Sequence, residues 1–433
     1  MRLSVVTLLL VPAALGAQVP ADSAREIALD EAIRLAQRNA PAAVQARGQL
    51  RTASAARTAS YAAFIPNVTV SMGAAYNPDA GTRVIGDRLV GGTKYTGSEG
   101  LSLNLNLFDG GRRFYDVRAA RANADLAAAN ELGQRYQVAL DVQQTFFNAL
   151  AARESESAAR AQLEQAEQQM RASTSRVAAG AATRSDSLRS AILVGNAQLA
   201  LLTAQNDLRT ANASLTRLVA TPFTVTAASA DTLPVITQLP DSSELIRLAE
   251  RGPAVEVAEA SRTAARAAYR AARTPYLPSI DVSFGRTATG AATSLSSSFR
   301  DSLDYQSSLR FSLSYPLFNQ FNREEARIRA DVAAANADAA LRDARLAAKQ
   351  QLTQYLGALT TAAQRVRIQS TSVAAAEEDL RVQQQRYAVG ASTLLDVLTS
   401  QTQLNQAQAA LIAARYDYRV AKAQLEALVG RQL

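Results

Sequence analysis

Four short stretches of the chain alternate apolar and polar residues with a period of two. They cover residues 66–76, 100–108, 278–285 and 308–318. In the second stretch leucine occupies positions 101, 103, 105 and 107, with serine or asparagine between them. An extended chain turns successive side chains to opposite faces, so each stretch predicts a β-strand with one apolar and one polar face. The polar-face residues that we expect to line water include Asn104, Asn106, Asp281 and Arg310.

Most of the remaining chain predicts helices. Shorter helices are expected at about 27–60 and 243–274. No proline occurs between Asp79 and Thr221, so residues 112–178 can form one helix, roughly 100 Å long at 1.5 Å per residue. A seven-residue apolar period, which predicts a coiled-coil seam, then follows in each half of the chain. It is carried by Val194, Leu201, Leu208 and Leu215, and by Leu404, Leu411, Tyr418 and Leu425.

One helix interruption occurs twice. Residues 176–188 read RVAAGAATRSDSL and residues 386–398 read RYAVGASTLLDVL, with the shared Arg, Gly, Thr and Asp 210 residues apart. The same offset links the LF pairs at 107–108 and 317–318, and it drifts to 212 or 213 further upstream. An offset that stays nearly constant across so many positions indicates that the chain is one unit repeated twice. We predict repeat one at 27–220, a linker at 221–242 and repeat two at 243–430, each ordered helix, two strands, long helix, shorter helix.

Both copies of the interruption have the chemistry of a turn between two helices. Gly180 and Gly390 suit a left-handed helix end, where a Cβ would clash. The Thr-x-x-Asp spacing that follows, as in Thr393 and Asp396, is that of a capping box, and the acid suits the start of the next helix. The sequence therefore predicts two αα-hairpins.

The composition argues against an enzyme. Cysteine and histidine are absent, which removes disulfides, thiolate nucleophiles, imidazole bases and most zinc or iron sites. The net charge of +8 comes from 46 basic and 38 acidic residues that are scattered along the chain. Nucleic-acid binding would need a basic block, and the sequence has none. We predict no catalytic, cofactor or metal residues and no nucleic-acid partner.

The first residues have the layout of a secretory signal peptide. Arg2 precedes an apolar run over 5–15, and the small residues Gly16 and Ala17 follow. We expect a signal peptide at 1–17, cleaved after Gly16 or Ala17, and a mature chain at 18–433. The apolar run is too short for a permanent membrane helix, and no cysteine follows it to carry a lipid anchor. The chain is therefore expected to be exported.

For an exported protein, the strand lengths favour a membrane barrel, although a soluble sheet packed on a helix would give the same alternation. Strands of about ten residues match the length that a tilted membrane strand needs. Four strands cannot close a barrel, and lipid does not tolerate open edges, so the missing strands must come from other copies of the chain. Two copies would give eight strands and three would give twelve, and only the larger ring leaves an aqueous lumen.

In combination these motifs resemble the TolC family of outer-membrane efflux proteins. The resemblance is carried by the duplicated unit, LFDGGR at 107–112, the PLF ending at 318, RYAVGASTLLDVL at 386–398 and ARYDYRVAKAQLEALVG at 414–430. It covers essentially the whole mature chain. It implies a mainly α fold with a membrane β-barrel, in which a homotrimer forms one twelve-stranded barrel and a long α-helical barrel of coiled-coil hairpins projecting into the periplasm.

The same resemblance implies a function and partners. The protein would be a passive exit duct in the lipid of the outer membrane of a Gram-negative-type envelope. It would conduct small molecules in a tripartite system, docked by a periplasmic adaptor (membrane fusion) protein and driven by an inner-membrane pump. Two alternatives remain: the outer-membrane component of type I protein secretion, and a soluble periplasmic coiled-coil adaptor, against which the four strands argue.

The resemblance also gives the two turns a role. If the long helices leave the barrel side by side, both turns lie at its far, periplasmic end, which in the family is the gate. Three copies of Asp396 would ring the mouth, with Asp186 nearby. Some relatives carry a second acid where this chain has Thr399, so an acidic constriction would be weaker here. The tips expected to touch the adaptor are Ala179, Gly180, Ala181, Val389, Gly390 and Ala391.

Overall fold

The computed structural model describes residues 24–78, 83–85, 87–90, 94–180, 182–228, 241–292 and 303–433. The expected signal peptide at 1–17, Ala181 and the middle of the expected linker lie outside these residues. The chain divides into two compact units. Unit 1 comprises residues 1–40, 141–236 and 361–420, and unit 2 comprises 41–140, 237–360 and 421–433.

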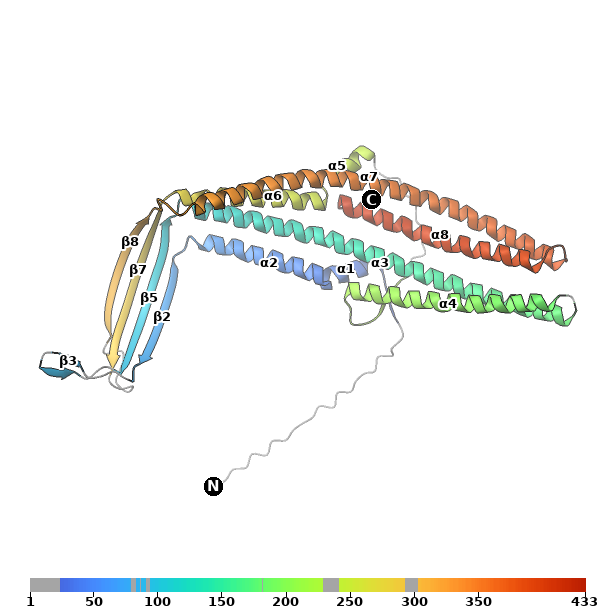
Figure 1. The fold of residues 1–433 in the computed structure, drawn as a ribbon, viewed down its shortest axis with the longest axis horizontal. Coiled ribbons are helices and arrows are strands. Elements are labelled where there is room, and N and C mark those ends of the chain that lie inside the picture. Colours follow the sequence, from blue (N-terminus) through green and yellow to red (C-terminus); the bar gives the residue numbers. More distant parts are fainter. Residues whose placement is uncertain are drawn as a thin grey trace, which may run out of the picture. The chain divides into compact units, whose positions relative to one another are not determined.

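Unit 2 contains an antiparallel sheet of four long strands that lie side by side (Figure 1). In sheet order they are β2 (Asn67–Tyr76), β5 (Tyr95–Phe108), β7 (Ser279–Ala292) and β8 (Asp304–Ser314). A short hairpin of β3 (Arg83–Ile85) and β4 (Arg88–Val90) falls between β2 and β5 in the chain. All four alternating stretches form strands as predicted. Within the described chain, β2 and β8 are open edges of this sheet.

The strand register sorts the side chains of the sheet onto two faces. Asn104 pairs with Asn67 and with Ser283, which in turn pairs with Arg310, so one polar row crosses all four strands. The adjacent row consists of Val68, Leu103, Phe284 and Leu309. The apolar face is uncovered: Met72, for example, is 78% exposed. An exposed apolar patch of this kind marks a surface that contacts lipid or another protein.

Unit 2 also contains several helices. They include α2 (Pro41–Ala62), α5 (Ser242–Ala249), α6 (Pro253–Ala271) and the 3-10 turn η1 (Thr274–Tyr276). Arg262 and Arg266 of α6 both form ion pairs with Asp338 of α7 (Asn322–Ala388), at 2.6 and 2.9 Å. Val255 of α6 packs in a buried cluster with Leu341 of α7. Charge pairs and apolar packing therefore fix these two helices together.

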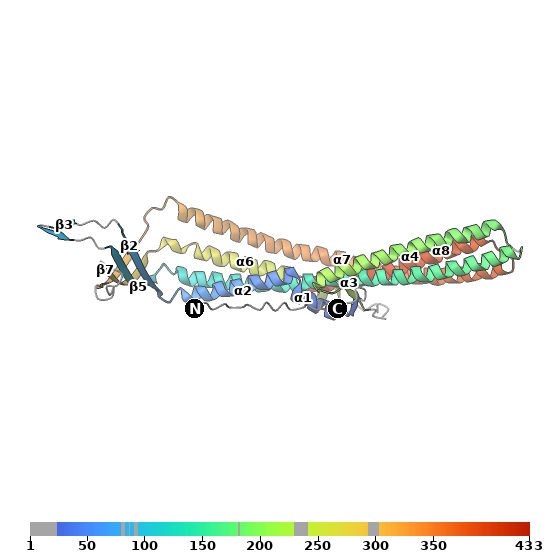
Figure 2. The same cartoon turned by 90° about the horizontal axis from the view of Figure 1, so that it is seen from below.

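Two helical hairpins make up most of unit 1. α3 (Arg112–Ala178) and α7 have 67 residues each, and their C-terminal parts in unit 1 lead into α4 (Arg184–Val219) and α8 (Leu394–Val429), which have 36 residues each (Figures 1 and 2). Equal lengths in the two halves agree with the duplication seen in the sequence. Every member of the second seven-residue series is buried, whereas of the first only Leu215 is. Among the helices of the described chain, none has the length and apolar character needed to cross a membrane.

The short helices near the start of each half differ from the prediction of one continuous helix. Over 27–60, β1 (Arg25–Ile27) pairs in parallel with β6 (Val225–Ala227), and α1 (Leu29–Asn39) ends before α2 begins. Over 243–274, α5 ends at residue 249 and α6 begins at Pro253. Proline cannot donate a backbone hydrogen bond and favours an extended preceding residue, so Pro41 and Pro253 each start a new helix.

Candidate functional site

The first hairpin turn of unit 1 joins α3 to α4. Gly180 has φ +72°, a left-handed conformation, with open space around it. The backbone N–H of Asp186 donates to Thr183 Oγ1 at 3.3 Å, and the backbone N–H of Thr183 donates to Asp186 Oδ2 at 3.1 Å. These reciprocal bonds satisfy N–H groups that a helix start otherwise leaves unpaired. The predicted left-handed glycine and capping box are both confirmed.

The second hairpin turn repeats this geometry with an additional donor. Gly390 has φ +78°, and the backbone N–H of Thr393 donates to Asp396 Oδ2 at 2.8 Å. The hydroxyls of Thr393 and Ser392 donate to the same oxygen at 2.7 and 3.0 Å. The Asp396 side chain is exposed, and all three bonds converge on Oδ2. The other carboxylate oxygen is therefore left for water or a passing cation.

These hydrogen bonds keep both turn acids ionised. The backbone N–H and hydroxyl of Thr393, followed by the Ser392 hydroxyl, lower the pKa of Asp396 below its ordinary value. For Asp186 the Thr183 hydroxyl and then the Thr183 backbone N–H lower the pKa. Donors that bind the charged form of a carboxylate stabilise that form. Each turn consequently carries a fixed negative charge at neutral pH.

The tip residues and Thr399 are solvent-exposed. Val389 is 80% exposed, and Ala179, Gly180, Gly390 and Ala391 are exposed as well. Ala181 lies outside the described residues. The Thr399 hydroxyl donates to the carbonyl of Leu395 in its own helix at 2.8 Å. The Thr399 side chain is uncharged, so it provides no second acid beside Asp396.

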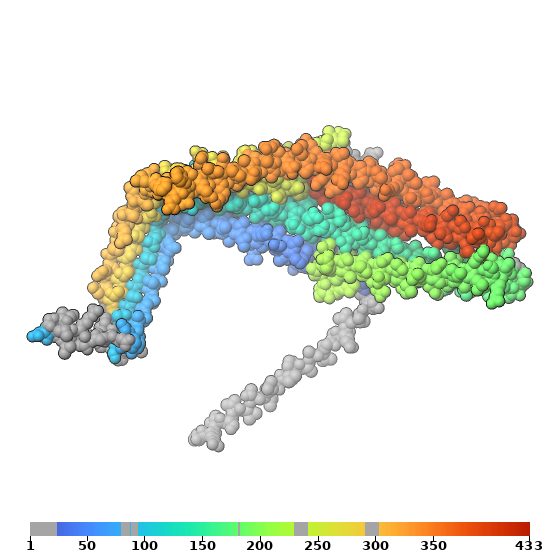
Figure 3. All heavy atoms as spheres, viewed as in Figure 1, coloured from blue at the N-terminus to red at the C-terminus, as the bar shows by residue number. Residues whose placement is uncertain are grey.

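Contacts that the sequence did not reveal join the two hairpins near their turns. The guanidinium of Arg176, at the end of α3, lies over the ring of Tyr387, at the end of α7, at 4.6 Å. The two turns therefore lie at the same end of unit 1 (Figure 3). Within the hairpins, Ser173 and Ser190 are buried and share a hydrogen bond of 2.9 Å. Arg176 belongs to the repeated motif, but sequence spacing alone does not show that its partner is aromatic.

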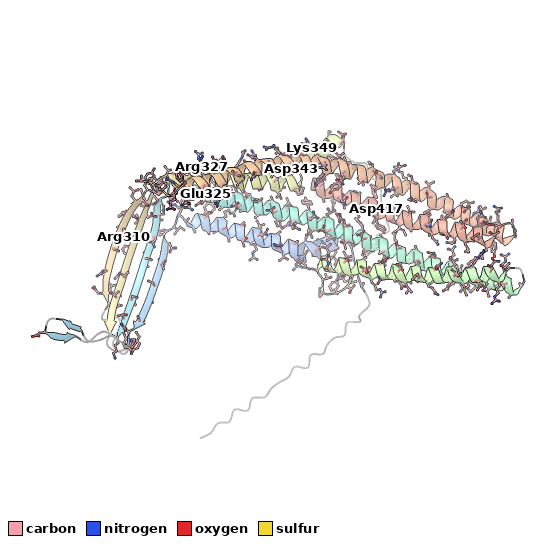
Figure 4. All side chains as sticks on the ribbon, viewed as in Figure 1. Arg310, Glu325, Arg327, Asp343, Lys349 and Asp417 are labelled. Atoms are coloured by element: carbon pink, nitrogen blue, oxygen red, sulfur yellow. The ribbon has the colours of Figure 1, made fainter. Side chains whose placement is uncertain are left out.

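The predicted water-facing residues of the sheet share one face. Asn106 Nδ2 donates to Asp281 Oδ1 at 2.7 Å across the β5–β7 pair. The register places Asn104 and Arg310 on the same side as this pair, and Figure 4 shows Arg310 on β8. This face is hydrophilic along its length and faces away from the apolar side chains.

A groove of about 400 Å³ in unit 1 is lined by side chains of α3 and α8, among which uncharged polar residues are the largest group. They include Gln162, Gln165, Gln401, Asn405 and Gln408. At one end Tyr416 donates to Glu154 at 2.6 Å, and burial together with this bond raises the pKa of the Tyr416 hydroxyl. Across the described residues there is no group of three His, Cys, Asp or Glu side chains that could hold a metal ion. The amide side chains of this groove can hydrogen-bond to water or to a polar solute.

An amphipathic sheet with open edges, long paired helices and charged hairpin turns define a channel or transport protein of the membrane. The family model for outer membrane efflux proteins matches residues 32–221 and 245–431. The chain therefore belongs to the outer membrane efflux protein family, and the fold class predicted from the sequence is confirmed. It is an outer-membrane efflux channel with its helical part in the periplasm.

Individual relatives agree with this family. Protein CyaE of Bordetella pertussis is 29% identical over 76% of this chain and 68% of its own length. The cobalt-zinc-cadmium resistance protein CzcC of Cupriavidus metallidurans is 27% identical over 48% of this chain, a match that spans about half of CzcC, 49%. The crystal structure of the outer membrane protein VceC from Vibrio cholerae has the same fold, with a TM-score of 0.73 and 18% identity over 93% of this chain and 96% of VceC.

Proposed function

We propose that three copies of this chain assemble into one exit duct. The observation that carries the proposal is the open sheet of β2, β5, β7 and β8, which has an uncovered apolar face and two unpaired edges. Open edges are not tolerated in lipid, so β8 of one copy pairs with β2 of the next until the ring closes. Three copies supply twelve strands, enough for a water-filled lumen lined by the row of Asn104 and Arg310.

The cargo that fits this duct is small molecules. The lumen face and the groove of unit 1 present hydroxyls, amides and a few charges, and among the described residues no group of three His, Cys, Asp or Glu side chains could hold a metal ion. We assign the protein no enzymatic step. A metal cation is among the small solutes that suit this duct, because the turn acids are ionised and one relative is named a cobalt-zinc-cadmium resistance protein. Release of a polypeptide through the same fold is the competing outcome.

The hairpin turns form the periplasmic gate in this proposal. Three copies of Asp396 ring the mouth, and Asp186 lies in the neighbouring turn. Thr399 lies beside Asp396, and its hydroxyl is hydrogen-bonded within its own helix. The contact between Arg176 and Tyr387 holds the two hairpins of one chain together and so favours a narrow mouth. The exposed tips at 179–181 and 389–391 serve as the docking surface for a periplasmic adaptor, which connects the duct to an inner-membrane pump.

Assembly and conduction can be tested on the purified protein. We expect it to require detergent, to have the mass of three chains, and to form ion-conducting pores in planar bilayers. A detergent-free monomer would contradict the assembly. Co-purification from native membranes then identifies the adaptor and pump: a pump for small solutes supports the cargo assignment, whereas a peptide-exporting pump replaces it with type I secretion.

A further inference from the structure

The junction between strand and long helix is built around an arginine in both halves of the chain. In the first half Arg113 lies over the ring of Phe64 at 4.9 Å and donates to the carbonyl of Leu107 at 3.0 Å. Its Nε donates to Asp109 Oδ2 at 3.2 Å, and both side chains of this pair are at most 15% exposed. The guanidinium charge is therefore neutralised inside the protein.

In the second half the same arginine lacks its acid. Arg323, 210 residues after Arg113, lies over the ring of Tyr276 at 5.0 Å and donates to the carbonyl of Pro316 at 3.1 Å. The position of Asp109 is taken by Asn319. Among the described residues, the buried atoms Arg323 Nε and Asn319 Oδ1 both lack a hydrogen-bond partner. Asn319 is uncharged, so the Arg323 guanidinium lacks the protein anion that Asp109 provides for Arg113.

The turn before Arg323 also differs from the turn before Arg113, because it has non-glycine residues at two left-handed positions. Gln320 and Phe321 have φ of 58° and 59°, at the positions that Gly110 and Gly111 occupy in the first half. A left-handed conformation costs a non-glycine residue about 1 kcal/mol or more. The Phe321 side chain is nevertheless 67% exposed. Its ring packs edge-on to that of Phe318, with ring centroids 5.5 Å apart.

The surroundings of Arg323 are apolar and open. The exposed fractions of Tyr315, Leu317 and Phe318 are 53%, 83% and 69%. Figure 4 marks the first turns of α7 with Glu325 and Arg327, close to the end of β8. In an outer-membrane protein with periplasmic helices, this strand end lies at the periplasmic surface of the bilayer, where aromatic side chains gather. Acyl chains can therefore reach the apolar side chains while a headgroup reaches the arginine.

Protein carboxylates near the site do not supply the missing anion. Glu325 forms an ion pair with Arg329, and Glu324 follows Arg323 directly, so the two side chains diverge on the helix. The edge strand β2 of the next copy, which would pair with β8, belongs to a stretch from residue 32 to 78 that contains no Asp or Glu. The neighbouring copy therefore cannot neutralise Arg323 from this stretch.

We propose that Arg323 binds the phosphate of a phospholipid from the periplasmic leaflet, one per chain. The guanidinium donates to a phosphate oxygen through a terminal nitrogen, which makes a charge-assisted hydrogen bond. Tyr276 holds the guanidinium plane, and Phe318 and Phe321 pack against the acyl chains. The first junction cannot do this, because Asp109 already neutralises the charge of Arg113.

The test uses the intact detergent-solubilised protein and native mass spectrometry with added phosphatidylethanolamine. We expect one lipid per chain on the unaltered protein. Asn319→Asp restores the internal ion pair, and Arg323→Gln removes the donor, so each should weaken retention about tenfold or more, as expected for losing a charge-assisted hydrogen bond. Arg112→Gln removes an exposed cation from the equivalent strand end and should leave retention unchanged.

Two further probes separate the phosphate from the other parts of the lipid. Diacylglycerol with the same acyl chains should not be retained, and inorganic phosphate should not displace the bound phospholipid. Equal retention of diacylglycerol would reduce the site to an apolar patch, and displacement by inorganic phosphate would make it a soluble-anion site; either result overturns the proposal. So does retention by Asn319→Asp or Arg323→Gln at the level of the unaltered protein. Pore formation is scored separately, so loss of the lipid does not count against the duct.

Discussion

A charge placed in the centre of the apolar sheet face should disrupt assembly more than the same charge one residue away. Leu105 pairs with Val282, which pairs with Phe311, and the rows on either side of this one are also apolar. On this face Arg286 is the next charged residue outward along β7, four residues from Val282. Leu105 therefore lies near the middle of the apolar band. Leu105→Arg should cost about 2–4 kcal/mol, which reduces the folded population roughly 30-fold or more.

Two control variants carry the same charge on the same sheet. Asn104→Arg points to the polar face, where the closest arginine in its row is Arg310, two strands away. Two strand spacings are about 10 Å, close to the Debye length at 0.1 M salt, so the repulsion is small. Met72→Arg stays on the apolar face but pairs with Glu99 beyond the level of Arg286, so its cost should be about 0–1 kcal/mol.

The assay is the yield of detergent-resistant oligomer, followed by denaturant unfolding of whatever assembles. The expected order of destabilisation is Leu105→Arg, then Met72→Arg, then Asn104→Arg. Equal losses for Leu105→Arg and Asn104→Arg would show that the two faces have been assigned wrongly. A larger loss for Met72→Arg than for Leu105→Arg would show that the centre of the apolar band lies closer to the β2–β5 turn than we infer.

Further predictions concern the turns. Gly390→Ala should lower stability by about 1 kcal/mol, because φ is +78° there, and a thermal shift measures it. Gln320→Gly relieves a left-handed conformation and should raise stability by about 1 kcal/mol, in the same assay. Asp396→Ala should lower cation preference in single-channel recordings, and unchanged selectivity would leave the acid with a capping role only. Because its folded pKa lies below 3.8, the Asp396 contribution to stability is complete above that pH and is lost as the pH falls through the folded pKa; Asp396→Asn should flatten this acid-side decline in a pH series of unfolding measurements.

The sequence predicted most of the fold because its strongest signals are periodic. The leucines at 101, 103, 105 and 107 place one face of β5, and the absence of proline allows the 67 residues of α3. The breaks at Pro41 and Pro253 were missed because the apolar pattern runs on through them. A proline can begin a helix as well as interrupt one, and the pattern does not distinguish the two.

The candidate site was predictable only where it depends on local chemistry. The capping acid Asp396 follows from spacing within one turn, and the structure shows the expected bonds. Arg176 with Tyr387 joins residues from opposite halves of the chain, and no local rule pairs them. The unpaired Arg323 likewise becomes visible only when its surroundings are compared with those of Arg113. The gate and docking roles themselves stay predictions.

The order of pairing in the sheet constrains how the protein is made. Asn106 and Asp281 meet across the central ladder although they are 175 residues apart in the sequence. Contacts between such distant residues form slowly, since a long loop must close before they stabilise anything. β5 therefore cannot pair with β7 until the second half has been synthesised and exported. Until then the β2–β5 hairpin has an uncovered apolar face and two unpaired edges. During that interval it is open to aggregation, and a holding chaperone in the periplasm would have to cover it.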